Sequence, residues 1–311
     1  MLYSIAVTTD FSSTSKQAFG AARSLVEKLG GRLHLLHVAQ GGQVHTPWNA
    51  PVETPGHFQK RHESAEQRLR DMVSSERVLQ GVRVEPRVLQ GESADAVRRF
   101  QEHEELDLIV IASHGSSGVQ HLALGSFATK VLQVVSCPVL VIRIDQSSPM
   151  SYEHGFRPKH FLVPHDFSRA SHHGLEIARA WARAFEASVK LLYVVEPVDG
   201  LEERAAGRGD SVSDYLERVR AEGLRRLDLL VSETDWESIP IKTEARVGQP
   251  AAEILKEASS CHSDLIVMAS RGLSVVERLR LGSVADRIIH RSSCPVLVVR
   301  QKGSQDPKLV S

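Results

Sequence analysis

Two Gly-Ser pairs, Gly125-Ser126 and Gly282-Ser283, have the chemistry that an anion site needs. Each stands where a loop is expected to pass into a helix, so that backbone N–H groups and the positive end of the helix dipole face a bound phosphate. Ser283 is expected to be the N-cap of the second of these helices. The alternative is that the glycines only shape turns, and a single copy alone would favour that interpretation.

The surroundings of the two pairs repeat each other. Residues 266–300 read almost as residues 109–143 do, with an apolar run, a loop glycine, the Gly-Ser pair and a Ser-Cys-Pro-Val-Leu-Val segment at constant spacing. A unit that returns in register after an intervening half-chain indicates a tandem repeat of a whole domain. The expected boundaries are 1–143 for the first domain, 144–158 for a linker and 159–301 for the second.

Both halves predict the same order of strands and helices, β-α-β-α-β-α-β-α-β. Uninterrupted apolar runs such as residues 265–269 are typical of parallel strands that are covered on both faces. We therefore expect an α/β fold in which each half is a five-stranded parallel, flavodoxin-like sheet with helices on both faces. The expected first-half elements are strands at 2–7, 33–38, 83–89, 106–112 and 138–143, a helix that Ser15 or Thr14 caps and that ends at Leu29, and helices at 57–79 and at 93–103. The expected second-half elements are a strand from 161, strands at 189–195, 239–247, 265–269 and 295–300, helices at 170–185, 211–232, 251–260 and 284–290, and a loop at 196–210.

Two aspartates, Asp10 and Asp166, stand directly after the first strand of each half. In an open parallel sheet, ligands bind at the carboxyl ends of the strands where the winding direction reverses, here between the first and fourth strands. This rule places each aspartate beside the loop that ends in a Gly-Ser pair. The alternative is that each aspartate is a turn or cap residue ahead of the first helix.

The glycine-bearing stretches resemble the signature of the universal stress protein family, whose nucleotide-binding members carry G-x2-G-x9-G-[S/T]. Gly115 and Gly272 match the second glycine, and nine residues separate each from its Gly-Ser pair. Ala112 and Ala269 stand where the family has its first glycine, so both halves depart from the signature at the same position. The resemblance covers almost the whole chain and implies two Rossmann-like domains related by a pseudo-twofold axis.

The resemblance also implies which residues meet an adenine nucleotide. In the family, the aspartate after the first strand and a residue after the second strand frame adenosine, and the glycine loop holds the phosphates. Carried over by position, the first-half residues are Asp10, Val38, Ala112, Gly115, Gly125 and Ser126. Their second-half counterparts are Asp166, Val194, Ala269, Gly272, Gly282 and Ser283.

Cations favour the second half as the nucleotide site. Its loop contains Arg271, Arg278 and Arg280, whereas the first loop has only His114 and His121. Arginine attracts phosphate beyond what backbone donors supply, although solvated surface arginines are the common alternative. We therefore expect ATP, with magnesium accompanying it, in the second half.

A histidine cluster in the second half suggests a zinc site. His165 and Asp166 follow the first strand, and His172 and His173 fall in the first turns of the next helix. Imidazoles and a carboxylate are zinc ligands, although adjacent histidines on a helix diverge by about 100° and only one of the pair would ligate easily. The alternative is a group of surface histidines near a helix start.

Composition excludes several classes of protein. The formal net charge is +0, from 38 basic and 38 acidic residues, so there is no electrostatic footprint for nucleic acid or for an acidic membrane surface. No signal peptide is expected at the N-terminus, no apolar run approaches the ~20 residues of a membrane helix, and no disulfide is expected among the three cysteines. A cytoplasmic protein is the resulting expectation.

Function by binding is expected rather than turnover. The chain shows neither a nucleophile elbow nor a clustered acidic receiver site, so we expect no enzyme, or at most a slow ATPase. The alternatives are an interaction scaffold with degenerate sites and a small-molecule or zinc sensor that uses the second half. The final strands of the two halves are apolar edges, and we expect them to cover each other within the chain, with further homodimerisation open.

Overall fold

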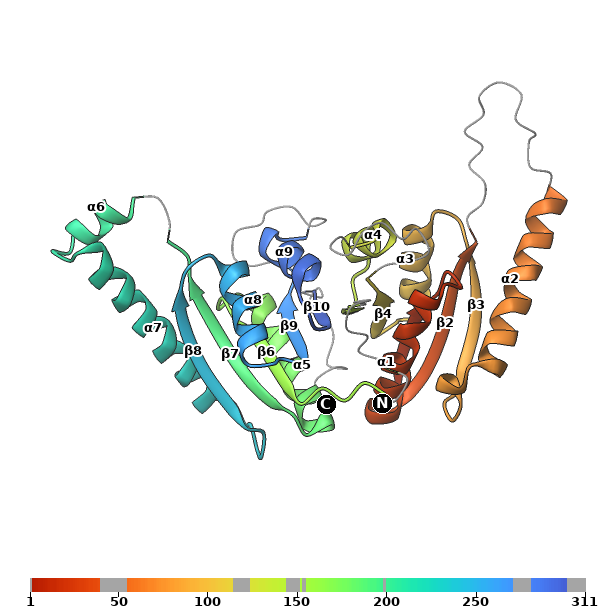
Figure 1. Ribbon diagram of the computed structural model, residues 1–311, viewed down its shortest axis with the longest axis horizontal. Helices are drawn as coiled ribbons and strands as arrows, with labels where there is room; N and C mark the ends of the chain where they lie inside the picture. Colours follow the sequence, from red (N-terminus) through yellow and green to blue (C-terminus); the bar gives the residue numbers. More distant parts are fainter. Residues whose placement is uncertain are drawn as a thin grey trace, which may run out of the picture. The chain divides into compact units, whose positions relative to one another are not determined.

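The computed structural model describes residues 2–39, 55–113, 124–143, 152, 155–197, 200–270 and 281–300. The chain forms two compact units, Met1–Phe156 and Arg157–Ser311 (Figure 1). Each unit is an α/β fold around a five-stranded parallel sheet, which confirms the predicted class. How the two units pack against each other stays a prediction.

The first unit has its strands in the order β3-β2-β1-β4-β5, all parallel. Its β1 therefore lies between β2 and β4, which is the reversal point that the sequence predicted. The elements are β1 (Tyr3–Thr8), α1 (Ser13–Leu29), β2 (Gly31–Ala39), α2 (Pro55–Ser75), a 3-10 turn (Arg77–Leu79), β3 (Val84–Gln90), α3 (Ser93–His103), β4 (Leu108–Ala112), α4 (Ser126–Val134) and β5 (Val139–Ile142).

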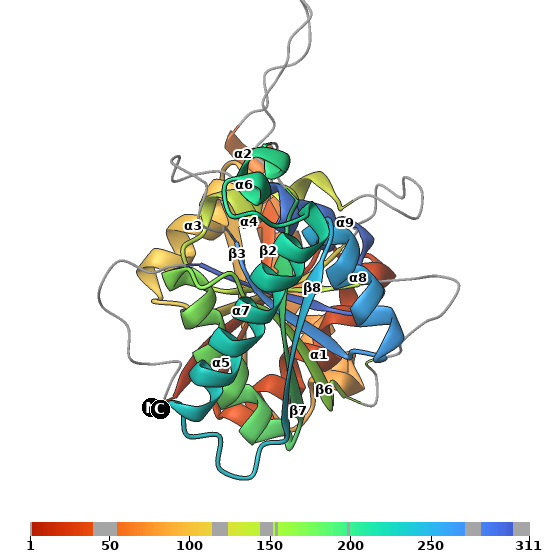
Figure 2. The same ribbon diagram turned by 90° about the vertical axis from the view of Figure 1, so that its left-hand side faces the viewer.

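The second unit repeats this order as β10-β9-β6-β7-β8. Helices α5 and α7 cover one face of its sheet, and α8 and α9 contact each other on the opposite face (Figure 2). The elements are β6 (His160–Pro164), α5 (Arg169–Phe185), β7 (Ser188–Val195), α6 (Leu201–Ala206), α7 (Val212–Ser232), β8 (Ile241–Val247), α8 (Pro250–Ser260), β9 (Leu265–Ala269), α9 (Ser283–Arg291) and β10 (Val296–Val299).

The strands that pass between two helical layers are the core of each unit. All five residues of β4 are buried, and so are all four residues of β10. The strands at the outer edges, β3 and β8, are only half-buried. The continuous apolar runs in the sequence therefore mark the central strands, as expected for a sheet covered on both faces.

The first helix of each unit begins earlier than predicted. Ser12 is the N-cap of α1 and accepts a hydrogen bond from the Ser15 N–H, and Ser168 caps α5 through the Ser171 N–H. Thr14 and Ser15 lie inside the helix, so their assignment as caps was wrong. Both residues are plausible caps by type, and the serine nearest the strand takes the position.

The helices after the Gly-Ser pairs also start one residue early. Gly282 is the N-cap of α9 and Ser283 is its first residue, so the prediction that Ser283 is the cap was wrong. Gly125 has the same place at the start of α4, and in neither case does a side chain accept from the helix N–H groups. Their donors are therefore left available.

Other boundaries also differ from the predictions. The helix expected to reach Leu79 ends at Ser75, because Glu76 adopts an extended conformation and a 3-10 turn follows. The strand expected from Leu106 begins at Leu108, since the Asp107 carboxylate instead accepts from the Ser4 N–H at 2.8 Å. The loop expected at 196–210 contains the short helix α6.

Part of the predicted linker packs on the first unit. Tyr152 and Phe156 are buried, and the Phe156 N–H donates to the Ser24 hydroxyl of α1 at 2.8 Å. Gly20 of α1 permits this approach, because a Cβ there would lie 1.7 Å from the Tyr152 carbonyl oxygen. The second unit has Glu176 at the corresponding position of α5, so this feature belongs to the first unit.

None of the helices in the described parts of the chain has the length and apolar character that crossing a membrane requires.

Candidate functional site

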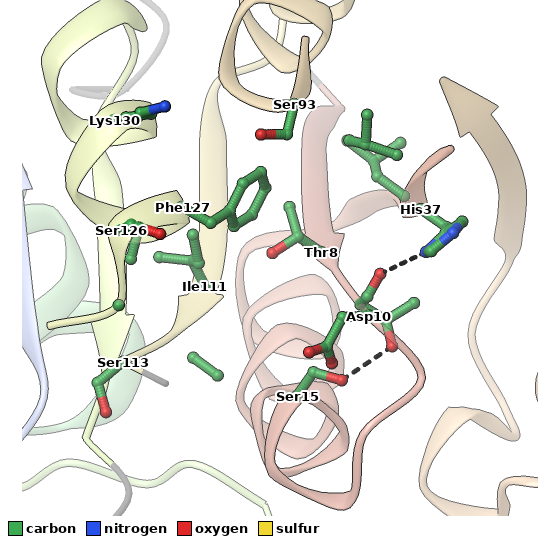
Figure 3. A pocket seen from close by; sticks show the side chains of 16 residues that line it. Thr8, Asp10, Ser15, His37, Ser93, Ile111, Ser113, Ser126, Phe127 and Lys130 are labelled. Carbon is green, nitrogen blue, oxygen red and sulfur yellow. Dashed lines mark hydrogen bonds between the residues drawn. The ribbon is translucent and has the colours of Figure 1, made fainter. Parts of the chain in front are cut away.

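Each unit has a cavity at the carboxyl ends of its central strands. The cavity of the first unit has a volume of about 320 Å³ and lies between the ends of β1 and β2 and the start of α4 (Figure 3). The cavity of the second unit, at the equivalent place, has a volume of about 330 Å³. Both are within the usual size range of small-molecule sites, about 300–1,000 Å³.

Most of the predicted site residues line these two cavities. In the first unit they are Asp10, Val38, Ala112, Gly125 and Ser126. In the second unit they are Asp166, Val194, Ala269, Gly282 and Ser283. The remaining predicted residues, Gly115, Arg271 and Gly272, and the cations Arg278 and Arg280, lie outside the described residues. That any of these residues binds nucleotide stays a prediction.

The aspartates serve as turn residues and as cavity wall at once. One oxygen of Asp10 accepts from the Ser12 N–H at 3.0 Å, and one oxygen of Asp166 accepts from the Ser168 N–H at 3.0 Å. Burial alone would raise the pKa of Asp166, but the hydrogen bonds from Ser168 and Ser171 and the nearby His165 lower it overall. The carboxylate is therefore charged at neutral pH.

The backbone N–H groups of the glycines in the two Gly-Ser pairs are already hydrogen-bonded, which the sequence did not predict. The Gly282 N–H donates to the Ser270 carbonyl at 2.9 Å, and the Gly125 N–H donates to the Ser113 carbonyl at 2.8 Å. The glycine N–H groups therefore close the loops and do not face a ligand. In the second unit the first-turn N–H groups of Ser283, Val284 and Ala285 have no intrahelical acceptor, so they are the donors that the helix start offers.

The alanines at the first signature position fit the backbone without strain. Ala112 and Ala269 end their strands, and neither is among the residues with positive φ. A glycine is required only where φ is positive or where another group approaches too closely for a side chain. The substitution of alanine for glycine thus leaves the loop start intact in both units.

Several cavity residues were not singled out from the sequence. Ser93 and Phe127 face the first cavity from α3 and α4, and Lys130 lies one turn into α4 (Figure 3). Pro250 and Val284 occupy the positions of Ser93 and Phe127 in the second unit. The repeat offset could have located all of them, because they follow the third strand or the Gly-Ser pair of each half. The side chains of Ser93 and Phe127 differ so much from their counterparts that the pattern carried no chemical signal there, whereas Lys130 corresponds to another cation, Arg287.

The zinc prediction is not supported by the geometry. The described part of the chain contains no group of three His, Cys, Asp or Glu side chains placed to hold a metal ion. His172 directs its Nδ1 to the Ser168 carbonyl at 2.8 Å, and His173 lies 3.4 Å from the Glu176 carboxylate. The His165 and His172 rings meet edge to face, with centroids 4.7 Å apart. His172 and His173 thus contact partners at the start of α5 and within it, and do not converge with His165 on a shared ion.

His165 instead works as part of the cavity wall. Its Nδ1 accepts from the Phe167 N–H at 3.2 Å. In the first unit the Thr9 hydroxyl accepts the equivalent hydrogen bond from the Phe11 N–H. Burial lowers the pKa of His165 to about 4, and the nearby His172 and Arg226 act in the same direction. The ring is therefore neutral at physiological pH.

Comparison with known proteins agrees with this architecture. The profile of the universal stress protein family matches residues 1–143 and again residues 158–300. The chain belongs to the universal stress protein family, with two copies of the family's domain. This confirms the resemblance that the glycine-bearing stretches predicted.

Individual members of the family match single halves of the chain or all of it. The universal stress protein MJ0531 of Methanocaldococcus jannaschii is 37% identical over 145 residues, which are 46% of this chain and 82% of that protein. The universal stress protein YxiE of Bacillus subtilis is 31% identical over 148 residues, 46% of this chain and all of its own length (100%). The crystal structure of a universal stress protein from Archaeoglobus fulgidus covers 97% of both chains with a TM-score of 0.70 at 20% identity, which shows the shared fold.

Proposed function

We propose that this universal stress protein binds an adenine nucleotide in the cavity of its second unit and acts through binding rather than turnover. The observation that supports the proposal is the pairing of two features across one cavity of about 330 Å³. The charged carboxylate of Asp166 lies on the β6 side, and the uncapped start of α9 lies on the β9 side. Such a cavity suits a ligand with a polar, uncharged end and an anionic end.

The two ends of the cavity would hold different parts of the nucleotide. The phosphates would meet the N–H groups of Ser283, Val284 and Ala285, which carry the positive end of the helix dipole. The nucleoside would lie toward Asp166 and Val194, where the carboxylate would accept from a hydroxyl or amino group. When ATP binds, magnesium would accompany its phosphates, and no residue of the chain is assigned to the ion.

Thermal unfolding tests this proposal. A ligand at ~100 times its dissociation constant stabilises the native state by about 2.7 kcal/mol, which a melting experiment resolves. The wild-type chain and Gly282→Val are compared with and without millimolar ATP and magnesium. Gly282 has φ −66°, so valine fits the backbone there and acts by filling the cavity. We expect stabilisation of the wild type and little or none of the variant.

Other outcomes have definite meanings. Absence of a shift in the wild type would refute nucleotide binding and leave an interaction scaffold as the function. A shift that survives Gly282→Val and disappears in Gly125→Val would move the site to the first unit.

A further inference from the structure

A stacked pair of a phenylalanine and an arginine stands at the rim of each cavity. The Cζ atom of Arg68 on α2 lies 3.9 Å from the ring centroid of Phe11, and Arg226 on α7 lies 3.9 Å from that of Phe167. Both phenylalanines directly follow the cavity aspartates and have positive φ, 67° and 62°. A bulky residue in the left-handed region is strained, and such strain gathers at functional sites.

The two guanidinium groups differ from their neighbours in having no anionic partner. Arg70, Arg220 and Arg225 on the same two helices form ion pairs with glutamates of their own helix. Arg68 and Arg226 have neither an ion pair nor a hydrogen bond within the described residues. Stacking on a ring occupies the face of a guanidinium and leaves its in-plane N–H donors for an acceptor. Each arginine is therefore an oriented cation that has no anionic partner in the part of the chain that the structure describes.

In the first unit this arginine borders a second hollow that adjoins the cavity. The hollow has a volume of about 350 Å³ and shares Asp10 and His37 with the cavity. Arg61, Ser64 and Arg68 supply its other polar wall, from one face of α2. Burial lowers the pKa of His37, and the charge of Arg68 acts in the same direction, against a hydrogen bond to the Thr9 carbonyl. The cation thus stands close to a residue of the cavity itself.

The second unit does not repeat this basic wall. Helix α7 has Val219 and Glu222 where α2 has Arg61 and Ser64. Only the stacked arginine is common to both units. In the second unit the Glu222 carboxylate beside the arginine disfavours a second anion, whereas in the first unit two arginines and a serine outweigh the single carboxylate of Asp10.

We propose that the hollow of the first unit is an anion subsite, so that this unit accepts adenine nucleotides that carry a second phosphate outside the 5′ chain. The proposal rests on nucleotide binding in the family cavity and extends it to the first unit. The 5′ phosphates of such a ligand would meet the start of α4, and its second phosphate would reach the Arg68 fork past Asp10. A phosphate suits this fork because it accepts two parallel N–H bonds from one guanidinium.

The test compares two ligands that differ by one phosphate. Titration calorimetry on the full chain measures the affinity of adenosine 5′-monophosphate and of adenosine 3′,5′-bisphosphate, with the 2′,5′ isomer as a second arm. We expect at least one bisphosphate to bind the wild type about tenfold more tightly than the monophosphate, in keeping with a charge-assisted hydrogen bond. The preference should shrink as salt is raised, because the subsite is partly exposed.

Substitutions then assign the preference to the hollow. Arg68→Met keeps an unbranched side chain over Phe11 and removes the cation, so it should abolish the bisphosphate preference while monophosphate affinity stays within about twofold. Arg70→Met is the matched control on the same helix, since Arg70 pairs with Glu66 outside the hollow, and it should retain the preference. Arg226→Met should retain it as well, because the second unit lacks the basic wall.

The outcomes separate this inference from the proposed function. Monophosphate binding without any bisphosphate preference, or a preference that Arg68→Met leaves intact, would overturn the subsite and leave nucleotide binding standing. Equal weakening of both ligands by Arg68→Met would show a structural clamp and also overturn it. Failure of every nucleotide to bind would refute the proposed function, and the subsite with it.

Discussion

The interiors of the two units differ under the third helix of each. In the second unit Glu257 of α8 is 2% exposed and forms ion pairs with Lys190 and Arg246. In the first unit the equivalent residue is Phe100, whose ring meets the fully buried His34 edge to face, 5.4 Å between centroids. Burial lowers the pKa of His34 and favours the neutral ring.

The residues that meet under the third helix depend on one another: each unit has one matched group of side chains there. A buried carboxylate is stable beside two cations, and a neutral imidazole is stable beside an aromatic ring, so either set fits the same backbone. A mixture of the two sets leaves charged side chains at the buried position with fewer partners of opposite charge. Repeat copies can therefore diverge by exchanging whole sets, while single exchanges are costly.

The largest expected effect is that of Glu257→Phe, which puts the residue of the first unit into the second. Lys190 and Arg246 would lose their most deeply buried carboxylate partner and keep only the more exposed Glu244 in common, and we expect a loss of about 3 kcal/mol in the free energy of unfolding. Urea denaturation of the full chain measures it. The triple variant with Lys190→His and Arg246→Leu restores a matched set and should lose less. A single variant as stable as the wild type would contradict the comparison.

His165 makes the stability of the second unit depend on pH, and the equivalent residue of the first unit, Thr9, does not titrate. The folded pKa of His165 is lowered to about 4 from an ordinary value of 6.5. The unfolded chain therefore binds the proton more readily, and stability falls as pH drops from 6.5 to 4, by about 3 kcal/mol in total. Urea unfolding at pH 7, 5.5 and 4.5 should show a steeper loss for the wild type than for His165→Thr. Parallel curves would argue against a neutral, buried ring.

A smaller effect concerns the packing of α7 on the sheet. Gly223 faces the Tyr193 ring, and a Cβ there would lie 2.2 Å from the ring's Cδ1 atom. The first unit has Ala65 opposite His37, a larger residue opposite a smaller ring. We expect Gly223→Ala to destabilise by about 1–2 kcal/mol despite the better helix propensity of alanine. Adding Tyr193→His should recover most of the loss in a thermal melt, and no recovery would refute the pairing.

The fold could be predicted from the sequence because the relevant signals are long and repeated. Apolar runs such as Leu265–Ala269 mark the buried strands, and the offset between the halves fixes their order. Helix starts were less predictable, since several serines in a row, from Ser12 to Ser15, could each cap α1. The short helix α6 was not predicted, because six residues are too few for a helical periodicity to be recognised.

The candidate site was predictable in position and less so in chemistry. Asp10 and Asp166 could be placed at the cavities from topology alone. The Gly282 N–H donates to the Ser270 carbonyl, so only the next three N–H groups of the helix start remain as donors. This backbone hydrogen bond could not be predicted from residue types. The zinc prediction was misled for a similar reason, because Ser168 and Glu176 engage His172 and His173 within the helix.

The most direct test of nucleotide binding in the second unit is titration calorimetry of ATP and magnesium with three full-length chains. These are the wild type, Gly282→Val and the matched variant Gly125→Val in the first unit. Both glycines are N-caps with negative φ, so valine fits each backbone equally and fills only its own cavity. The account predicts that ATP binds the wild type and Gly125→Val alike, and Gly282→Val at least tenfold more weakly. Binding that is lost in Gly125→Val and kept in Gly282→Val would contradict it.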